Sequence, residues 1–215
     1  DEKSNEIPAV PALLKLLELS DATVTLVAMH CQVETARTIV AAEADYILIV
    51  KGNQDGLYEY LHERFLEYGE RDYQVPGLRR HVTVERSHGR QERREYYFIA
   101  APRDSAILKR WPGLRSIGMI YRCREEGEKT QEETQFVISS HLPKVKMLSQ
   151  HIRGHWGIEN RQHWVLDVTF AEDASRIRRG TAPEISAAFR RMALNILQLD
   201  TTIKENIRGK RLRAG

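Results

Sequence analysis

Two short apolar runs decide the fold class: TVTLVA (Thr23–Ala28) and DYILIVK (Asp45–Lys51). Both are rich in β-branched residues, which is typical of strands that are buried on both faces. Residues 32–43, between them, carry apolar side chains at helical spacing. A strand, a helix and a strand at this spacing predict two parallel strands joined by a right-handed crossover. We therefore expect an α/β domain whose functional groups gather at the C-terminal ends of these two strands.

Helical patterns flank this unit. Residues 7–19 and 55–68 repeat apolar side chains every three or four positions, so both segments are expected to be helices. Pro8 and Pro11 then have to lie in the first turn of the first helix, where a missing N–H costs little.

The second half of the chain changes character twice. Between Arg79 and Ser139 the pattern predicts an antiparallel meander of strands over residues 81–86, 95–100, 117–124 and 134–139. Helical spacing returns at Lys144 and ends in a helix over residues 184–199. That helix starts after Pro183, and its apolar stripe consists of Ile185, Ala188, Phe189, Met192, Ile196 and Leu199.

These elements predict three parts. Residues 1–75 are expected to form the N-terminal part of the core, residues 76–142 a β-rich insertion, and residues 143–215 a C-terminal helical part. At 215 residues the chain is long enough to bury a hydrophobic core in one domain.

The composition is that of an ordinary globular protein, with 41% hydrophobic and 29% charged residues. No apolar run approaches the roughly 18 residues that a membrane span needs. The charged start, DEKSNE, does not resemble a signal peptide. Cys31 and Cys123 cannot form a disulfide framework, so we expect free thiols in a reducing, cytoplasmic compartment.

The net charge of +3 hides an asymmetry along the chain. Residues 144–215 carry 14 Lys and Arg against 7 Asp and Glu, a balance of +7, which leaves −4 for residues 1–143. Basic charge gathered at one end indicates contact with nucleic acid. For Lys204–Arg213 alone, a solvated and mobile basic tail is the favoured interpretation.

The run HIRGHWGIENRQHW (His151–Trp164) sets one glutamate, Glu159, among aromatic and cationic residues. Such a setting suits a place where a metal ion meets a polyanion, although an exposed helix face would look similar. Zinc is excluded as improbable, because the histidines lack a companion cysteine pair. Downstream acids either support a site or pair with nearby arginines on a solvated loop; the acids are Asp167, Glu172 and Asp173, and the arginines Arg176, Arg178 and Arg179.

Several of these segments, taken in order, resemble the DDE transposases of bacterial insertion sequences, in the H-repeat-associated branch. The segments are DEKSNEI (Asp1–Ile7), VTLVAMHCQ (Val24–Gln32), KGNQ (Lys51–Gln54), HGR (His88–Arg90), WPGL (Trp111–Leu114) and HWGIEN (His155–Asn160). The resemblance implies an RNase H-like fold, here expected to be incomplete at its N-terminus, interrupted by the β-rich insertion and closed by C-terminal helices.

The resemblance also implies an active site of two aspartates and a glutamate that hold two Mg²⁺ or Mn²⁺ ions. Glu159 matches the catalytic glutamate and is the implied metal ligand. The second aspartate belongs at the position of Val27, and the first is expected upstream of Asp1, outside this chain. Because valine offers no ligand atom, the chain as given is expected not to cut or join DNA.

The implied partner is DNA, both transposon ends and target DNA, with no membrane; a homodimer is left open. Expected phosphate contacts are Arg153, His155, Arg161 and His163, together with Arg90 and Arg94 in the hairpin of the insertion. Lys51–Gln54 is either a backbone approach to phosphate or a tight turn. Two other functions are weighed: a non-catalytic DNA-binding or regulatory module, and a single-metal nuclease that uses Glu159 with a downstream acid.

Overall fold

A computed structural model describes residues 6–87, 89–103, 105–158 and 162–214. The chain divides into two compact units, Asp1–Ile152 and Arg153–Gly215, and each is described by itself. No helix in the described ranges is both long and apolar enough to cross a membrane.

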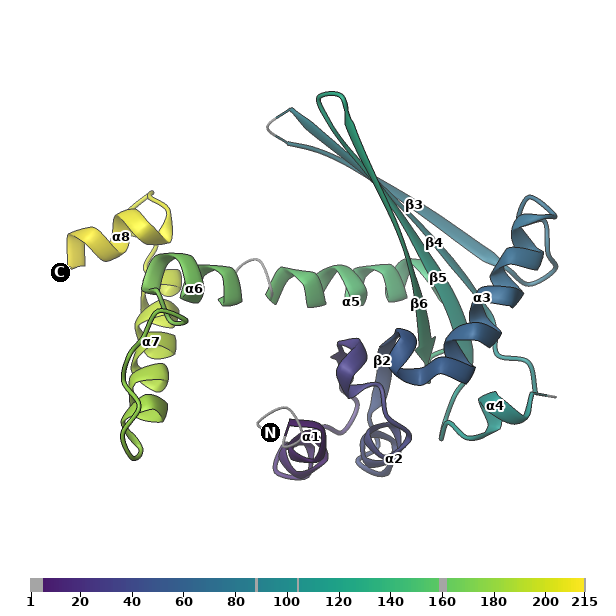
Figure 1. Ribbon diagram of the computed structural model, residues 1–215, viewed down its shortest axis with the longest axis horizontal. Helices are drawn as coiled ribbons and strands as arrows, with labels where there is room; N and C mark the ends of the chain where they lie inside the picture. Colours follow the sequence, from purple (N-terminus) through teal and green to yellow (C-terminus); the bar gives the residue numbers. More distant parts are fainter. Residues whose placement is uncertain (1–5, 88, 104, 159–161, 215) are drawn as a thin grey trace. The chain divides into compact units, whose positions relative to one another are not determined.

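The first unit begins with alternating helices and strands (Figure 1). These are α1 (Glu6–Leu14), β1 (Thr23–Leu26), η2 (Ala28–His30), α2 (Val33–Ala41), β2 (Asp45–Val50), η3 (Gly52–Gln54) and α3 (Asp55–Gly69). The meander follows, as β3 (Arg79–Ser87), β4 (Arg90–Ala100), α4 (Ala106–Lys109), β5 (Ser116–Glu126) and β6 (Lys129–Ser139). Helix α5 (Val145–Ile158) then leads into the second unit.

The six strands of the described ranges form one sheet, in the order β1-β2-β6-β5-β4-β3. Strands β1 and β2 are parallel, with Thr23 opposite Asp45, which confirms the predicted crossover. The antiparallel meander is also confirmed. Its last strand pairs with β2, from Ile47 opposite Ser139 to Val50 opposite Phe136, so the meander extends the same sheet. The division at residues 75 and 142 stays a prediction.

The main core lies on one face of the sheet, under helix α3. Val50, Phe136 and Met119 lie opposite one another on β2, β6 and β5, and all three are buried. From α3, the ring of Phe65 stacks on Phe136 with 6.0 Å between centroids. Burying a side chain of this size contributes roughly 1.5–3 kcal/mol, so this cross-strand row joins the crossover unit to the meander.

On the other face a glycine makes room for an aromatic ring. Phe98 on β4 lies opposite Gly118 on β5, and its side chain is fully buried. A Cβ built on Gly118 would lie 2.6 Å from Phe98 Cδ1, closer than carbon atoms approach without displacement. The strand therefore requires glycine here for packing, and not for its backbone conformation.

Helix α1 departs from the sequence prediction. It ends at Leu14 rather than at residue 19, and Pro11 lies inside it, so the placement of Pro11 in the first turn was wrong. An interior proline cannot donate the N–H that continues the hydrogen-bond ladder. The helix ends within one turn of Pro11, and Leu16, beyond that end, is 83% exposed.

The N-terminal ends of β1 and β2 are held by a histidine after β6. His141 Nδ1 lies 3.2 Å from Asp45 Oδ2, and its Nε2 lies 2.9 Å from Thr23 Oγ1. Ser140 Oγ donates to the other oxygen of Asp45 at 2.5 Å. A neutral ring with its proton on Nδ1 satisfies both contacts of His141. Two parallel strands and the meander thus meet at one imidazole.

The second unit is helical and has a small core. It contains α6 (Trp164–Phe170), α7 (Ala182–Leu199) and α8 (Ile207–Ala214). Val165, Leu166 and Leu194 are buried, with Phe170 and Ile207 packed against them.

The C-terminal segment departs at one residue from the expectation of a solvated basic tail, because it forms helix α8 and Lys210 packs at the end of α7. Lys210 is only 8% exposed, and its Nζ donates to the carbonyl oxygen of Leu197 at 3.0 Å and to that of Asp200. Carbonyls at the end of a helix lack partners within that helix, and a cation nearby satisfies them.

The apolar stripe of α7 does not face the core of this unit. Its large members are each more than half exposed: Ile185, Phe189, Met192, Ile196 and Leu199. The packed side carries Leu194 instead, which is 1% exposed. Both ends of the helix follow the prediction closely: Pro183 lies in its first turn, and it ends at Leu199.

Substituting Gly118 with alanine tests the close packing against Phe98. We expect a loss of about 1–3 kcal/mol in the free energy of unfolding, because the added methyl group forces the buried ring to move. Urea unfolding measures it. The matched control is Gly56→Ala on α3, where nothing lies within 4 Å of the added atom; that variant should keep or gain stability, by up to about 1 kcal/mol. Equal effects in both variants would contradict this packing.

The His141 contacts predict a pH dependence of stability. Burial lowers the pKa of His141 below its usual 6.5, and this outweighs the opposite effect of Asp45; His151, Lys144 and Arg115 lower it further. As the pH falls below about 6.5, the unfolded chain therefore takes up a proton before the folded chain. We expect the free energy of unfolding to decrease from pH 7.5 to pH 5.5, and to decrease less in His141→Gln. The prediction fails if the variant and the parent chain respond equally in urea titrations.

Candidate nucleic-acid interface and metal site

Val27 stands directly after β1, where the chain turns into η2. Its backbone is still extended, with φ −69° and ψ 163°, and it is 37% exposed. Its carbonyl oxygen accepts from the His30 N–H at 3.0 Å, which closes the short turn. Residue 27 therefore lies at the end of a strand, as the sequence predicted, and its side chain is aliphatic.

The amides of the KGNQ run hold this turn in place. Asn53 Nδ2 donates to the carbonyl oxygen of Ala28 at 2.7 Å, and Gln54 Nε2 donates to Gln32 Oε1 at 3.1 Å. Both amides therefore join the turn after β2 to the segment between β1 and α2. This supports a turn that positions Val27, whereas a phosphate contact by these amides stays a prediction.

The donor set at this strand end does not suit magnesium. Mg²⁺ prefers oxygen ligands, usually carboxylates, and the side chain of Val27 has no oxygen. Across the described part of the chain, no group of three or more His, Cys, Asp or Glu residues is arranged to hold a metal ion.

Glu159 and Arg161, two of the predicted site residues, lie outside the described residues. The structure describes what surrounds them in sequence: α5 ends at Ile158 and α6 begins at Trp164. Arg153 and His155, on the last turns of α5, are half-buried and already interact with other groups.

His163 lies beside a polar hollow of about 490 Å³ in the second unit. Asp167, Glu172 and Arg191 line it as well, so charges of both signs face the same space. Glu172 Oε1 also lies 3.7 Å from Arg190 Nη1. The hollow can therefore accept a polar ligand, but one of its two carboxylates is already paired.

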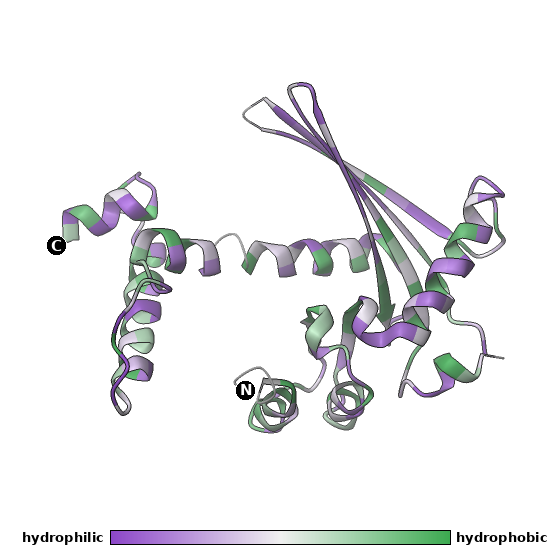
Figure 2. Cartoon of the chain, in the orientation of Figure 1, coloured by the Kyte–Doolittle hydropathy of each residue, from purple (hydrophilic) through white to green (hydrophobic). Residues whose placement is uncertain are grey.

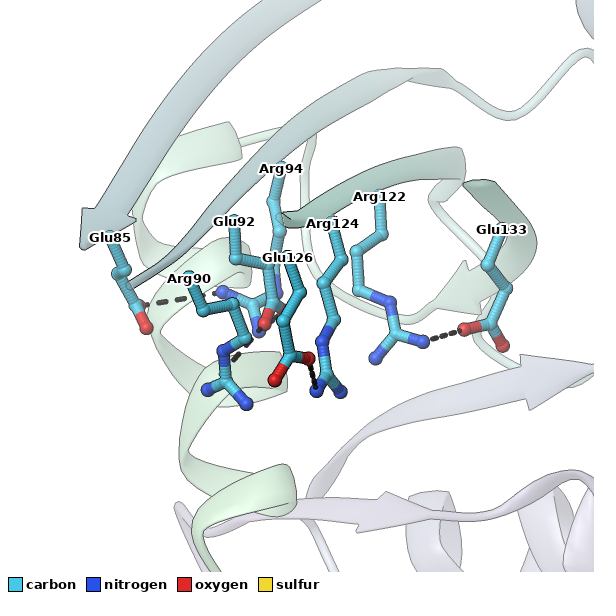
Figure 3. Close-up of polar contacts among 8 residues, drawn as sticks. All are labelled: Glu85, Arg90, Glu92, Arg94, Arg122, Arg124, Glu126 and Glu133. Carbon is cyan, nitrogen blue, oxygen red and sulfur yellow. Dashed lines mark hydrogen bonds and ion pairs between the residues drawn. The ribbon is translucent and has the colours of Figure 1, made fainter. Parts of the chain in front are cut away.

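The arginines of the predicted hairpin contact are paired with glutamates within the meander (Figure 3). The side chain of Arg94 is 4% exposed and pairs with Glu92, and at 3.5 Å with Glu85. Arg90 is more open, at 41%, and its Nη2 lies 3.9 Å from Glu92. Of the two hairpin residues in the prediction, only Arg90 is presented to solvent.

The same face of the neighbouring strands continues this arrangement. Arg122 pairs with Glu133 and Arg124 with Glu126, each at 2.6 Å (Figure 3). The ends of β3–β6 at the two hairpin turns are accordingly hydrophilic, whereas the opposite ends of β4, β5 and β6 are apolar (Figure 2). Cationic residues spaced two apart on paired strands share one face. Counting the glutamates at the same spacing would have predicted this neutralisation.

Comparison with known families matches residues 1–196 to the Transposase DDE domain. This match covers most of the chain. The chain belongs to the DDE transposase family.

Curated relatives of this DDE transposase chain place it in the H-repeat type. It is 39% identical over 215 residues to "Putative transposase YncI" of Escherichia coli O157:H7, covering 98% of the chain and 54% of the relative. It is 34% identical over 219 residues to "H repeat-associated putative transposase YhhI" of Escherichia coli K12, covering 100% of the chain and 57% of the relative. The chain thus spans about half the length of these relatives. No solved structure matches it.

Arg94 provides the test of whether the meander arginines are structural. Arg94→Gln leaves the buried Glu92 with only the longer contact to Arg90, so it should lower the free energy of unfolding by about 3 kcal/mol, the lower end of the usual cost of breaking a buried pair. The control, Arg124→Gln, breaks the more exposed pair with Glu126 and should cost less than about 1 kcal/mol. Chemical unfolding of both variants measures the difference. If Arg94→Gln lowered the free energy of unfolding by less than about 1 kcal/mol, the buried ion pair of Arg94 would not be important for stability.

Proposed function

We propose that this chain is the catalytic-domain portion of a DDE transposase that binds DNA but does not assemble a working two-metal centre. Val27 carries the proposal. It lies at the end of the first parallel strand, where the family resemblance calls for an aspartate, and its side chain has no oxygen. The family membership and the parallel crossover support the transposase assignment and an RNase H-like core.

Glu159 alone is proposed as the surviving carboxylate of the catalytic set. Two metal ions would need further oxygen ligands, and an aliphatic residue at position 27 removes one of them. The exposure of Val27 supports this reading, because a valine at 37% exposure contributes little to the core. An aspartate would fit there without a buried charge.

DNA binding is proposed to rest on the basic C-terminal part, where residues 144–215 carry a charge of +7. Arg153, His155, Arg161 and His163 are the proposed contacts near Glu159, with Arg90 on the meander. Arg94 is left out, because its guanidinium is buried against Glu92. The substrates proposed by family are transposon ends and target DNA, with Mg²⁺ or Mn²⁺ as the metal of active members.

A non-catalytic DNA-binding or regulatory role is the second candidate. The same observation at Val27 favours it, because binding to phosphates needs cations and no metal ligands. The two candidates differ in what restoring the aspartate would do. In a catalytic domain, Val27→Asp rebuilds part of a metal site, whereas in a binding module it only adds a negative charge.

Two assays test the proposal. With Mg²⁺ or Mn²⁺, neither the parent chain nor Glu159→Gln should nick supercoiled DNA above background. In calorimetry, Val27→Asp should bind Mn²⁺ at least about tenfold more tightly than the parent chain, the smallest effect usual for groups that support a metal site. Val27→Asn is the control, because it changes the size and polarity of the side chain without adding a charge.

The outcomes separate the candidates. Nicking by the parent chain that Glu159→Gln abolishes would show that the chain is active, contrary to the proposal. Mn²⁺ binding that does not change in Val27→Asp would argue against a metal position at residue 27. In that case the DNA-binding module becomes the better description.

A further inference from the structure

The loop between α6 and α7 presents three arginines to solvent. Arg176, Arg178 and Arg179 are all exposed. Within the described residues, no carboxylate lies within ion-pair distance of any of them. The guanidinium of Arg178 donates only to the neighbouring Ile177 carbonyl oxygen, at 3.2 Å. The loop therefore carries three positive charges that the fold itself does not neutralise.

The acids expected to pair with these arginines are placed elsewhere. Glu172 interacts with Arg190 at 3.7 Å, and it shares the polar hollow with Asp167. Asp173 is exposed, and no ion pair joins it to the loop arginines in the described chain. A solvated loop with internal ion pairs was one interpretation of this sequence, and the structure does not form those pairs.

Three cations near the C-terminus of the second unit are engaged by the fold, whereas Arg191, Lys204 and Arg208 are exposed. Lys210 is held by two carbonyl oxygens at the end of α7. Arg211 stacks over the ring of Phe170, 5.0 Å from its centroid, and Arg213 pairs with Glu205 at 2.5 Å. The meander arginines are likewise paired with glutamates. The cations of the chain thus differ in how free they are to bind a ligand, and the three loop arginines form no ion pair within the described residues.

The backbone of the loop is shaped by its own hydrogen bonds. The Ala182 N–H donates to the Arg179 carbonyl oxygen at 3.2 Å, across a turn in which Gly180 has φ +52°. Glycine adopts this conformation without strain, whereas a side chain would not. At the other end, the Ser175 N–H donates to the Glu172 carbonyl oxygen at 3.0 Å. The three arginines therefore extend from a chain segment anchored at both ends.

We propose that Arg176, Arg178 and Arg179 form a phosphate clamp that contacts the backbone of duplex DNA independently of sequence. Guanidinium groups bind phosphate through paired N–H donors. These three need not break an ion pair to do so, which is the cost that the meander arginines would incur. The inference rests on the proposed DNA binding and adds the residues that supply it.

The test compares two triple variants of equal net charge. The clamp variant is Arg176→Gln, Arg178→Gln and Arg179→Gln. The control variant is Arg37→Gln, Arg71→Gln and Arg124→Gln, which neutralises arginines that pair with Glu34, Glu67 and Glu126. Both lose three positive charges, so a difference between them reflects position and not net charge. Binding to a duplex of arbitrary sequence is measured between 50 and 200 mM salt, with circular dichroism to verify folding.

Each phosphate contact contributes about −0.9 to the slope of log affinity against log salt. The clamp variant should therefore have a slope shallower by about 2.7. Over this fourfold range of salt, the parent chain should lose about 40-fold more affinity than the clamp variant. The control variant should keep the slope of the parent chain.

The outcomes distinguish this inference from the function on which it rests. If the parent chain shows no salt-dependent binding, both the DNA-binding proposal and the clamp are overturned. If the parent binds and the clamp variant has the same slope, only the clamp is overturned. A slope that becomes equally shallow in both triple variants would assign the effect to net charge and would also overturn the clamp.

Discussion

The pairing of β2 with β6 is the constraint on which the first unit depends. It joins strands that lie about ninety residues apart in sequence, with Ile47 opposite Ser139. Ser139 Oγ donates to the Tyr46 carbonyl oxygen, and the Tyr46 N–H donates to Ser140 Oγ. The side chains of Ser139 and Ser140, at the end of β6, thus continue the hydrogen-bond ladder where regular pairing ends. Through this junction the crossover unit and the meander share one core, and Val27 is positioned by a sheet that both parts build.

The strands of the first unit could be predicted because their residues carry the signal locally. β-branched runs such as Asp45–Val50 are recognisable without knowledge of their neighbours. The order of the sheet could not be predicted, because nothing local indicates that β6 pairs with β2. The prediction of which face of α7 is buried was wrong for a related reason. Its apolar stripe has helical periodicity, but periodicity does not show which side packs on α6 and α8, and Leu194 lies on the packed side.

The sequence predicted the position of a site residue well where that position depends only on a neighbouring strand. It predicted the availability of a charge poorly, because that depends on contacts with residues far away in sequence. Val27 is where the sequence placed it, because a residue that follows a strand keeps that position in the fold. For cations, the outcome depends on partners. Arg94 and Arg178 are both arginines in basic segments, yet the first is buried against Glu92 and the second is exposed. Composition counts both equally, whereas only the fold shows which charge is available.

The two outermost strands of the sheet differ in how they face further strand addition. β3 is lined with charged side chains, among them Arg79, Arg80 and Glu85. Such residues discourage another chain from hydrogen-bonding alongside. β1, on the opposite side, is the uncharged tetrapeptide TVTL and is only partly buried. The β1 edge is therefore the more open of the two to a further strand, and such a strand would run beside the segment that leads to Val27.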